Sequence, residues 1–194
     1  MIFELDNPTV VSCIKNGGCG IMPTDTVFGI VAGAFSKDGV EKIFKLKKRD
    51  SAKPPVILVS TIADLKNFKV DVDKGTNDFL KKNWPGEISV IMPCVNKEFY
   101  YLHRGKNSLA FRMPDNKGII SFLKKTGPIA TSSANLQGKS TVTTITQAQK
   151  IFKDKVDFYV NGKTAKTTAS TIVKIQGGKV EIVRKGSGKI YPVK

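Results

Sequence analysis

The chain has 194 residues, of which 40% are apolar and 25% charged, as in ordinary folded globular proteins. Its 32 basic and 16 acidic residues give a formal net charge of +16. No apolar run approaches the roughly 18 residues that span a bilayer, which excludes a membrane-spanning protein. At about 150 residues per domain, the length predicts a single soluble domain over residues 1–194.

The first predicted element is a helix that is capped by Asn7, has Pro8 in its first turn and ends at Gly17-Gly18. Apolar runs and breakers then predict strands or extended segments at 20–22, 27–34, 56–59, 88–92, 108–112, 156–160, 171–175 and 180–183, and helices at 36–49, 61–67, 74–83, 116–125 and 144–153. Helices and strands alternate for most of the length. We therefore predict an α/β fold with a mixed sheet flanked by helices.

The N-terminal residues and the cysteines bear on location and chemistry. Residues 1–6 are acidic where a signal peptide would be basic, which predicts a cytoplasmic protein. Cys13, Cys19 and Cys94 are odd in number and form no CxxC pair, so we expect reduced, packing thiols. The single histidine, His103, is expected to be a solvated or stacking loop residue rather than a catalytic one.

The positive charge is concentrated in the C-terminal part of the chain. Residues 1–115 carry 17 basic and 13 acidic groups, a net charge of +4. Residues 116–194 carry 15 basic and three acidic groups, a net charge of +12. Such an excess is typical of a protein that contacts RNA phosphates. The alternative is a lysine-rich solvated surface.

Two segments, Gly138-Lys139-Ser140 and Gly162-Lys163-Thr164, end like a P-loop. The first glycine of that motif would fall at Ser133 or Asp157, so neither is a Walker A sequence. The hydroxyl-rich stretch 131–135, which follows an apolar strand at 127–130, is more informative. Its O–H groups can donate to phosphate or carboxylate oxygens, although a simple turn is the alternative.

Several short motifs occur in one order, which is more specific than any of them alone. They are Pro23-Thr24-Asp25-Thr26-Val27-Phe28-Gly29-Ile30, Lys47-Lys48-Arg49, Lys53-Pro54, Trp84-Pro85-Gly86 with Ser89, Leu109 to Pro114, Pro128 to Asn135 with Gly138, Ser170-Thr171-Ile172-Val173 and Arg184-Lys185-Gly186. Together they closely resemble the YrdC family of threonylcarbamoyl-AMP synthases. Ser89 stands where that family has threonine, and it keeps the hydroxyl.

The resemblance implies a twisted α/β sheet with an open concave cavity. It also implies an enzyme that condenses L-threonine, bicarbonate and ATP into L-threonylcarbamoyladenylate and pyrophosphate, the first step toward the t6A37 modification of tRNA. Such a reaction needs the protein to position the substrates and to neutralise their phosphate charge, and it does not need a protein nucleophile. Mg²⁺ would arrive with ATP, held by phosphate and water, so that no protein metal site is expected.

The motif match also implies roles for individual residues. ATP would be bound by Lys47, Arg49, Ser133, Asn135, Thr141 and Arg184, of which Lys47 and Arg49 would be catalytic. L-threonine would be bound by Thr24, Arg112, Thr131 and Ser170. The guanidinium of Arg112 suits the carboxylate of the amino acid, because its planar fork can bind two oxygens.

The expected partners are the three substrates, proteins that transfer the threonylcarbamoyl group to tRNA, and RNA through the basic surface; no membrane is expected. The chain resembles the short form of the family, without an extra C-terminal domain. Two other functions remain open at this point. One is an RNA-binding module of the same fold, and the other is a paralogue with a different carbamoyl or adenylate substrate.

Overall fold

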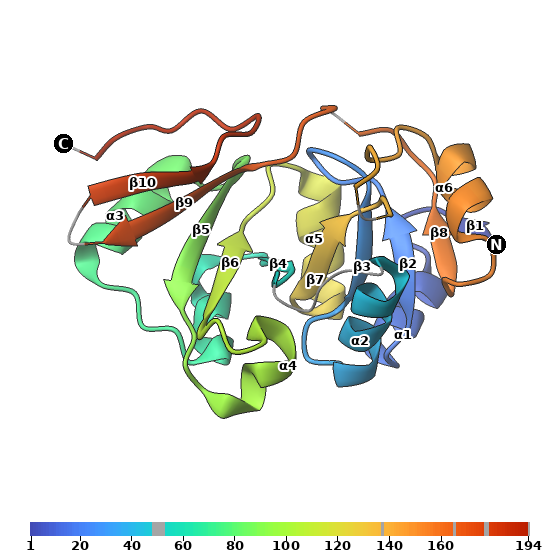
Figure 1. Ribbon diagram of the computed structural model, residues 1–194, viewed down its shortest axis with the longest axis horizontal. Coiled ribbons are helices and arrows are strands. Elements are labelled where there is room, and N and C mark those ends of the chain that lie inside the picture. Colours follow the sequence, from blue (N-terminus) through green and yellow to red (C-terminus); the bar gives the residue numbers. More distant parts are fainter. Residues whose placement is uncertain (48–52, 137, 165, 177–178, 194) are drawn as a thin grey trace.

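The computed structural model describes residues 1–47, 53–136, 138–164, 166–176 and 179–193. Its strands are β1 (Ile2–Phe3), β2 (Cys19–Met22), β3 (Gly29–Gly33), β4 (Val56–Leu58), β5 (Ile88–Pro93), β6 (Ser108–Arg112), β7 (Ile129–Ser133), β8 (Phe158–Val160), β9 (Thr171–Gln176) and β10 (Lys179–Arg184). They form one ten-stranded sheet in the order β1-β8-β2-β3-β7-β4-β6-β5-β9-β10 (Figure 1). The predicted α/β class with a twisted sheet is confirmed.

Most of the helices begin at a residue whose side chain accepts a hydrogen bond from the first turn. They are α1 (Pro8–Lys15), α2 (Lys37–Lys47), η1 (Ile62–Phe68, a 3-10 helix), α3 (Lys74–Asn83), η2 (Lys97–Phe99, also 3-10), α4 (Tyr100–His103), α5 (Lys117–Thr126) and α6 (Ile145–Phe152). Asn7 accepts a hydrogen bond from the Thr9 N–H at 2.9 Å, and Ser36 accepts one from the Gly39 N–H at 3.0 Å. Both predicted caps are therefore confirmed.

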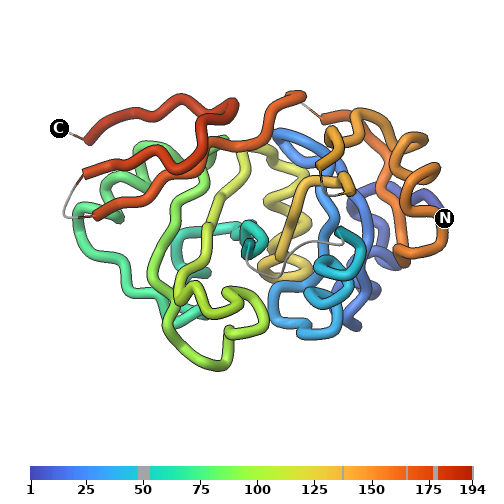
Figure 2. The backbone as a smooth tube through the Cα atoms, viewed as in Figure 1, coloured from blue at the N-terminus to red at the C-terminus, as the bar shows by residue number. Residues whose placement is uncertain are grey.

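The sheet contains both parallel and antiparallel pairs, so it is mixed as predicted. β2, β3, β7 and β4 pair antiparallel in turn, β4 then pairs parallel with β6, and β5 pairs parallel with β9. The chain ends lie at opposite ends of the long axis, with β1 and β8 near the N-terminus and β9 and β10 near the C-terminus (Figure 2). In the middle of the sheet, this strand order places strands that are distant in sequence, such as β3 and β7, next to each other.

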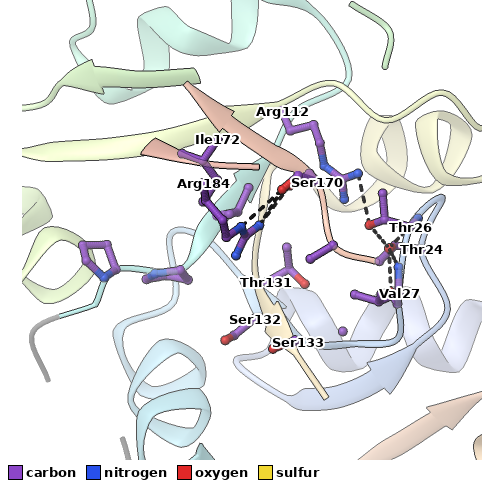
Figure 3. A pocket seen from close by; sticks show the side chains of 15 residues that line it. Thr24, Thr26, Val27, Arg112, Thr131, Ser132, Ser133, Ser170, Ile172 and Arg184 are labelled. Atoms are coloured by element: carbon purple, nitrogen blue, oxygen red, sulfur yellow. Dashed lines mark hydrogen bonds between the residues drawn. The ribbon is translucent and has the colours of Figure 1, made fainter. Parts of the chain in front are cut away.

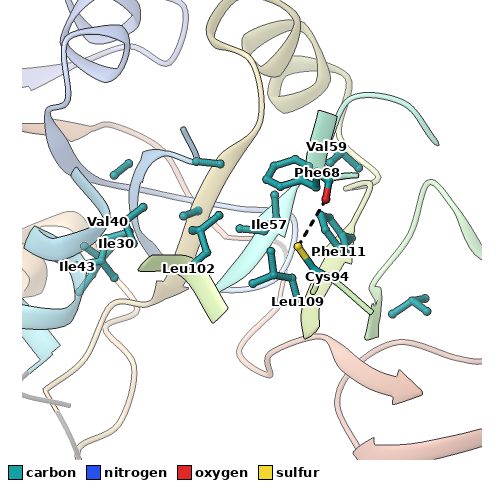
Figure 4. Packing of buried hydrophobic residues seen from close by; sticks show 14 of the residues in the cluster. Ile30, Val40, Ile43, Ile57, Val59, Phe68, Cys94, Leu102, Leu109 and Phe111 are labelled. Carbon is teal, nitrogen blue, oxygen red and sulfur yellow. Dashed lines mark hydrogen bonds between the residues drawn. The ribbon is translucent and has the colours of Figure 1, made fainter. Parts of the chain in front are cut away.

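Helices cover both faces of the sheet. Ile30 and Val31 are consecutive in β3 but belong to different buried clusters, because alternate side chains of a strand point to opposite faces. The Val31 cluster packs against α1 and α5. The Ile30 cluster packs against α2, α3, α4 and α6, and Figure 4 shows part of it around Ile57 and Phe111.

Asp157 ties β2 and α2 to the start of β8. Its Oδ2 accepts hydrogen bonds from the Cys19 N–H at 2.8 Å and from Lys42 Nζ at 3.0 Å. Partial burial alone would raise the pKa of Asp157, but the hydrogen bonds from Cys19 and Lys42 outweigh it and lower this pKa below 3.8. The charged form therefore stabilises the fold above about pH 4, and this stabilisation is lost as the pH falls through the folded-state pKa.

Asp157→Asn is expected to lower the free energy of unfolding at pH 7 by about 0.5–1 kcal/mol, a modest value because solvent screens this ion pair. The difference from the wild type should shrink as the pH falls below 3.8, because the Asp157 carboxyl group is then progressively protonated through its folded-state pKa. Melting curves at pH 7, 5 and 3 measure it, with exposed Asp154→Asn as the matched control. A Tm difference that is constant with pH would contradict the assignment.

The structure also corrects some sequence expectations. Thr131, Ser132 and Ser133 do not form a loop but belong to β7, which pairs with β3 on one side and β4 on the other. The helix predicted over 36–49 extends at least to Lys47, and its last two residues lie outside the described part of the chain.

Among the described helices, none has both the length and the apolar character needed to cross a bilayer.

Candidate active site

A cavity of about 130 Å³ opens between the 24–27 turn and strands that are not all neighbours in the sheet (Figure 3). Its walls come from the turn and β3, from the start of β4, from the end of β6, from β7, and from the β9 and β10 hairpin. The lining residues are Thr24, Thr26, Val27, Gly29, Pro54, Pro55, Val56, Arg112, Thr131, Ser132, Ser133, Ala169, Ser170, Ile172 and Arg184. Hydroxyl groups and two guanidinium groups make this a site for an anionic ligand.

Arg112 is a buried cation in the wall of the cavity. Its side chain is 4% exposed, and Nη1 lies 2.8 Å from Asp25 Oδ1 and 3.3 Å from Thr26 Oγ1. Nε has no hydrogen-bond partner among the described residues. A buried guanidinium with an unused N–H is a ready partner for a carboxylate.

Asp25 supplies the counter-charge for Arg112. The Asp25 carboxylate also accepts a hydrogen bond from the Asp115 N–H at 3.2 Å, which joins the 24–27 turn to the loop after β6. Burial raises the pKa of Asp25, although the nearby Arg112 opposes this rise. Removing either charge would leave the other one buried without compensation, so the pair holds the guanidinium in place.

The turn beneath the cavity is held by its own hydroxyl groups. Thr24 Oγ1 donates to the Val27 carbonyl oxygen at 2.6 Å and accepts from the Thr26 and Val27 N–H groups at 3.2 Å. Thr24 and Thr26 are only 5% and 2% exposed. The turn is therefore preorganised, with two threonine side chains against the cavity.

Ser170 and Arg184 form the opposite wall, and Figure 3 shows the guanidinium reaching Ser170. Arg184 Nη2 donates to the Ser170 carbonyl oxygen at 2.8 Å and to its Oγ at 3.4 Å. Thr171 fixes the same segment, because its Oγ1 accepts from the Gly186 N–H at 3.0 Å and donates to the Gly188 carbonyl at 2.8 Å. The chain after β10 thus holds the segment before β9.

Lys47 lies beside the cavity at the C-terminal end of α2. Its Nζ donates to the Ser133 carbonyl oxygen at 2.6 Å, to Ser133 Oγ at 3.3 Å and to Asn135 Oδ1 at 2.6 Å. A small hollow that includes Lys47 shares Pro55 and Ser132 with the main cavity. Lys47 therefore brings a positive charge to the rim of the site.

The structure brings together six of the residues that the resemblance implies. Thr24, Arg112, Thr131, Ser133, Ser170 and Arg184 all line the cavity. Lys47 and Asn135 lie next to it through their bonds to Ser133. Thr141 is half-buried in the loop before α6 and is not among the described lining residues. Arg49 lies outside the described residues.

Sequence reasoning did not assign Thr26, Ser132 or Asp25 to the site. Thr26 and Asp25 belong to the same turn motif as Thr24, which is a signal that could have found them. Ser132 is exposed to the cavity edge only because β7 is a strand rather than a loop. No single-sequence pattern distinguishes those two conformations for a run of small hydroxyl residues.

The histidine and the cysteines take no part in this cavity. His103 is 1% exposed at the end of α4 and meets the Tyr100 ring edge-on, so the prediction of a solvated or stacking loop residue is wrong. His103 is buried because its Nδ1 accepts from the Gly105 N–H at 3.2 Å and thereby closes a turn. Burial raises the pKa of Cys19 to about 12 and that of Cys94 to about 11, so neither is an ionised nucleophile at neutral pH.

Comparison with known proteins finds curated relatives that are named threonylcarbamoyl-AMP synthases. A putative threonylcarbamoyl-AMP synthase of Mycobacterium tuberculosis is 30% identical over 179 residues, which cover 92% of this chain and 82% of the relative. A putative threonylcarbamoyl-AMP synthase of Methanocaldococcus jannaschii is 32% identical over 174 residues, which cover 89% of this chain and 82% of the relative.

The fold is that of solved structures with low sequence identity. Sua5 of Pyrococcus abyssi with the substitutions H234A and Y235A has a TM-score of 0.86 at 22% identity, over 100% of this chain and 65% of that one. YciO of E. coli has a TM-score of 0.84 at 21% identity, over 97% of this chain and 96% of that one. A family model named Sua5_yciO_yrdC and described as "Telomere recombination" matches residues 12–186. The resemblance found in the motifs is thereby confirmed, and the chain belongs to the Sua5/YciO/YrdC family.

Proposed function

We propose that this chain is a threonylcarbamoyl-AMP synthase, which forms L-threonylcarbamoyladenylate and pyrophosphate from L-threonine, bicarbonate and ATP. The observation that carries the proposal is the buried guanidinium of Arg112 facing, across one cavity, the hydroxyl groups and the second guanidinium that suit phosphate. Relatives that are 30% and 32% identical over about nine-tenths of the chain bear this name. A Sua5 of the same fold has been solved in complex with L-threonine.

The amino acid fits the part of the cavity nearest Arg112. Its carboxylate would pair with the guanidinium of Arg112, which lines the cavity beside Thr24 and Thr26. Thr24, Thr131 and Ser170 would surround the rest of the small amino acid with hydroxyl groups. The α-amino group would then point into the open part of the cavity, where it would add to the carbon of bicarbonate with loss of water to give a carbamate.

The triphosphate fits the opposite side. Arg184 and Lys47 would neutralise phosphate charge, and Ser133 and Asn135 would hold the loop that approaches the phosphates. We also assign Arg49 and Thr141 to the nucleotide, on the motif match alone. Cations that are already fixed by hydrogen bonds stabilise a developing charge without having to reorganise during the reaction.

The chemistry that these residues support is a displacement at phosphorus. A carbamate oxygen attacks the α-phosphorus of ATP, the bond to the β-phosphate oxygen breaks, and pyrophosphate leaves. The protein supplies orientation and positive charge, and it needs no nucleophile of its own. This agrees with the absence of histidine and cysteine from the described cavity lining.

A divalent metal belongs to this scheme as the companion of ATP. Among the described residues, no cluster of three His, Cys, Asp or Glu side chains could hold a metal ion. We therefore propose that Mg²⁺ enters with ATP and is held by phosphate oxygens and water. Its contribution would be to neutralise phosphate charge.

We extend the proposal to the role and partners of the product. The adenylate would pass to proteins that transfer the threonylcarbamoyl group to adenosine 37 of tRNA in the cytoplasm. The lysine excess over residues 116–194 suits attraction to RNA, whose phosphates bind cations and release counterions.

The test is an assay with purified protein, ATP, Mg²⁺, bicarbonate and labelled threonine. We expect pyrophosphate and a threonylcarbamoyladenylate, both dependent on bicarbonate, and much less product with serine. Threonine-dependent thermal stabilisation by ATP should accompany activity. Salt-sensitive RNA binding with no response to ATP or threonine would support the RNA-binding module instead. Turnover with another acceptor but not with threonine would support a paralogue.

Gly29→Ala probes how closely the cavity fits its ligand. A Cβ at Gly29 would lie 2.4 Å from Thr131 Oγ1, so this hydroxyl must move. We expect kcat/KM for threonine to fall by about tenfold or more, the size of effect of one lost or displaced polar contact in a binding pocket. Pyrophosphate release at varied threonine measures it.

The matched control is Gly75→Ala on the exposed side of α3, where an added Cβ makes only an ordinary contact with Asp73. This variant should keep full activity, and its Tm should stay the same or rise, because alanine favours a helix. An unchanged KM for threonine in a folded Gly29→Ala protein would contradict the placement of threonine beside Thr131.

A further inference from the structure

Ser89 lies behind the wall of the cavity and does not line it. It is 0% exposed near the start of β5, which pairs parallel with β9 so that Ile88 lies opposite Thr171. The Ser89 Oγ is 2.9 Å from the Ser170 Oγ, its one side-chain hydrogen bond within the described residues. Ser89, which does not line the cavity, therefore contacts Ser170, which does.

The direction of this hydrogen bond follows from counting donors and acceptors. Ser170 Oγ already accepts from Arg184 Nη2 at 3.4 Å, since a guanidinium can only donate. Ser89 has no second acceptor for its hydrogen among the described residues, and a buried hydroxyl hydrogen without a partner is costly. Ser89 therefore donates to Ser170. The hydrogen of Ser170 is left to point into the cavity.

We propose that Ser89 is a positioning residue, which fixes the hydroxyl of Ser170 as a donor toward an oxygen of the threonine substrate. This inference rests on the proposed function. It assigns a role in substrate binding to a side chain that makes no contact with the substrate. A hydroxyl held in one orientation loses less freedom on binding than one that rotates.

The first experiment compares Ser89→Ala with Ser89→Thr. Alanine removes the donor with almost no change in volume, whereas threonine keeps it. We expect Ser89→Ala to weaken threonine binding, measured by calorimetry, by about fivefold to tenfold, as for the loss of one hydrogen bond. The KM for ATP and kcat should change less than twofold. Ser89→Thr should restore threonine binding to within about twofold of the wild type.

A double-mutant cycle with Ser170→Ala separates positioning from packing. If Ser89 acts through Ser170, adding Ser89→Ala to Ser170→Ala should cause no further loss of threonine affinity. If Ser89 only packs, its effect should persist in the double mutant, or should appear in Tm without a change in threonine binding. Either of these results would overturn the inference.

Ser108→Ala is the matched control. Ser108 lies on the neighbouring strand β6, and its hydroxyl donates to the nearby Lys106 carbonyl away from the cavity. It should bind threonine as the wild type does. Wild-type protein that binds no threonine would overturn both the inference and the proposed function. Wild-type binding that Ser89→Ala leaves unchanged would overturn the inference alone.

Discussion

Replacing Lys47 by methionine is expected to lower kcat/KM for ATP by about 10²- to 10³-fold, the effect of removing one preorganised charge at a reacting phosphate. Methionine keeps the length of the aliphatic stem, which is only 4% exposed at the end of α2. It cannot donate to Ser133 or Asn135, so the loop after β7 also loses an anchor. Pyrophosphate release with varied ATP measures the effect.

Two further variants separate the charge of Lys47 from its packing. Lys45→Met removes an exposed lysine two residues earlier on α2 and should change kcat/KM by less than twofold. Lys47→Arg keeps the charge and should be more active than Lys47→Met. Equal activity of the wild type and a folded Lys47→Met protein would contradict a role for this lysine at the phosphates.

Arg112→Lys is expected to raise the KM for threonine by about 10- to 100-fold while kcat changes less. Lysine retains a positive charge for Asp25 but loses the planar fork that can bind a carboxylate with two N–H groups. The retained charge avoids leaving Asp25 buried alone, which would destabilise the protein by about 3–5 kcal/mol. Steady-state kinetics with varied threonine measure the change.

Arg104→Lys is the matched control for Arg112→Lys. Arg104 also pairs with an acidic residue, Glu41, but it follows α4 and does not line the cavity. Its replacement should leave the KM for threonine unchanged. If Arg112→Lys is folded and also keeps the wild-type KM, then the carboxylate of threonine does not bind at Arg112.

Local features of the fold could be predicted because local residues determine them. Asn7 and Ser36 begin helices through hydrogen bonds to residues two or three positions away, and such caps can be recognised in sequence. The order of the strands could not be predicted, since it depends on pairings such as Ser89 with Ile172 across more than 80 residues. Hydrophobic periodicity indicates that a strand exists but not which strand lies next to it.

The candidate site shows the same division. The resemblance placed Arg112 and Ser170 in one site because their motifs occur in a known order. Asp25 could have been assigned to the site from the motif it shares with Thr24, but its partner Arg112 and the role of Ser89 could not be read from residue type, because an acidic residue or a serine is more often exposed. Only the contacts of 2.8 Å and 2.9 Å show that each holds a cavity side chain.

The contribution of the β9 and β10 hairpin to the cavity has a consequence for synthesis. Thr24 leaves the ribosome long before Ser170, Ile172 and Arg184, which line the same cavity. The cavity is not complete until residue 184 has emerged and β9 has paired with β5. A complete substrate cavity therefore forms only after the chain has been translated past residue 184.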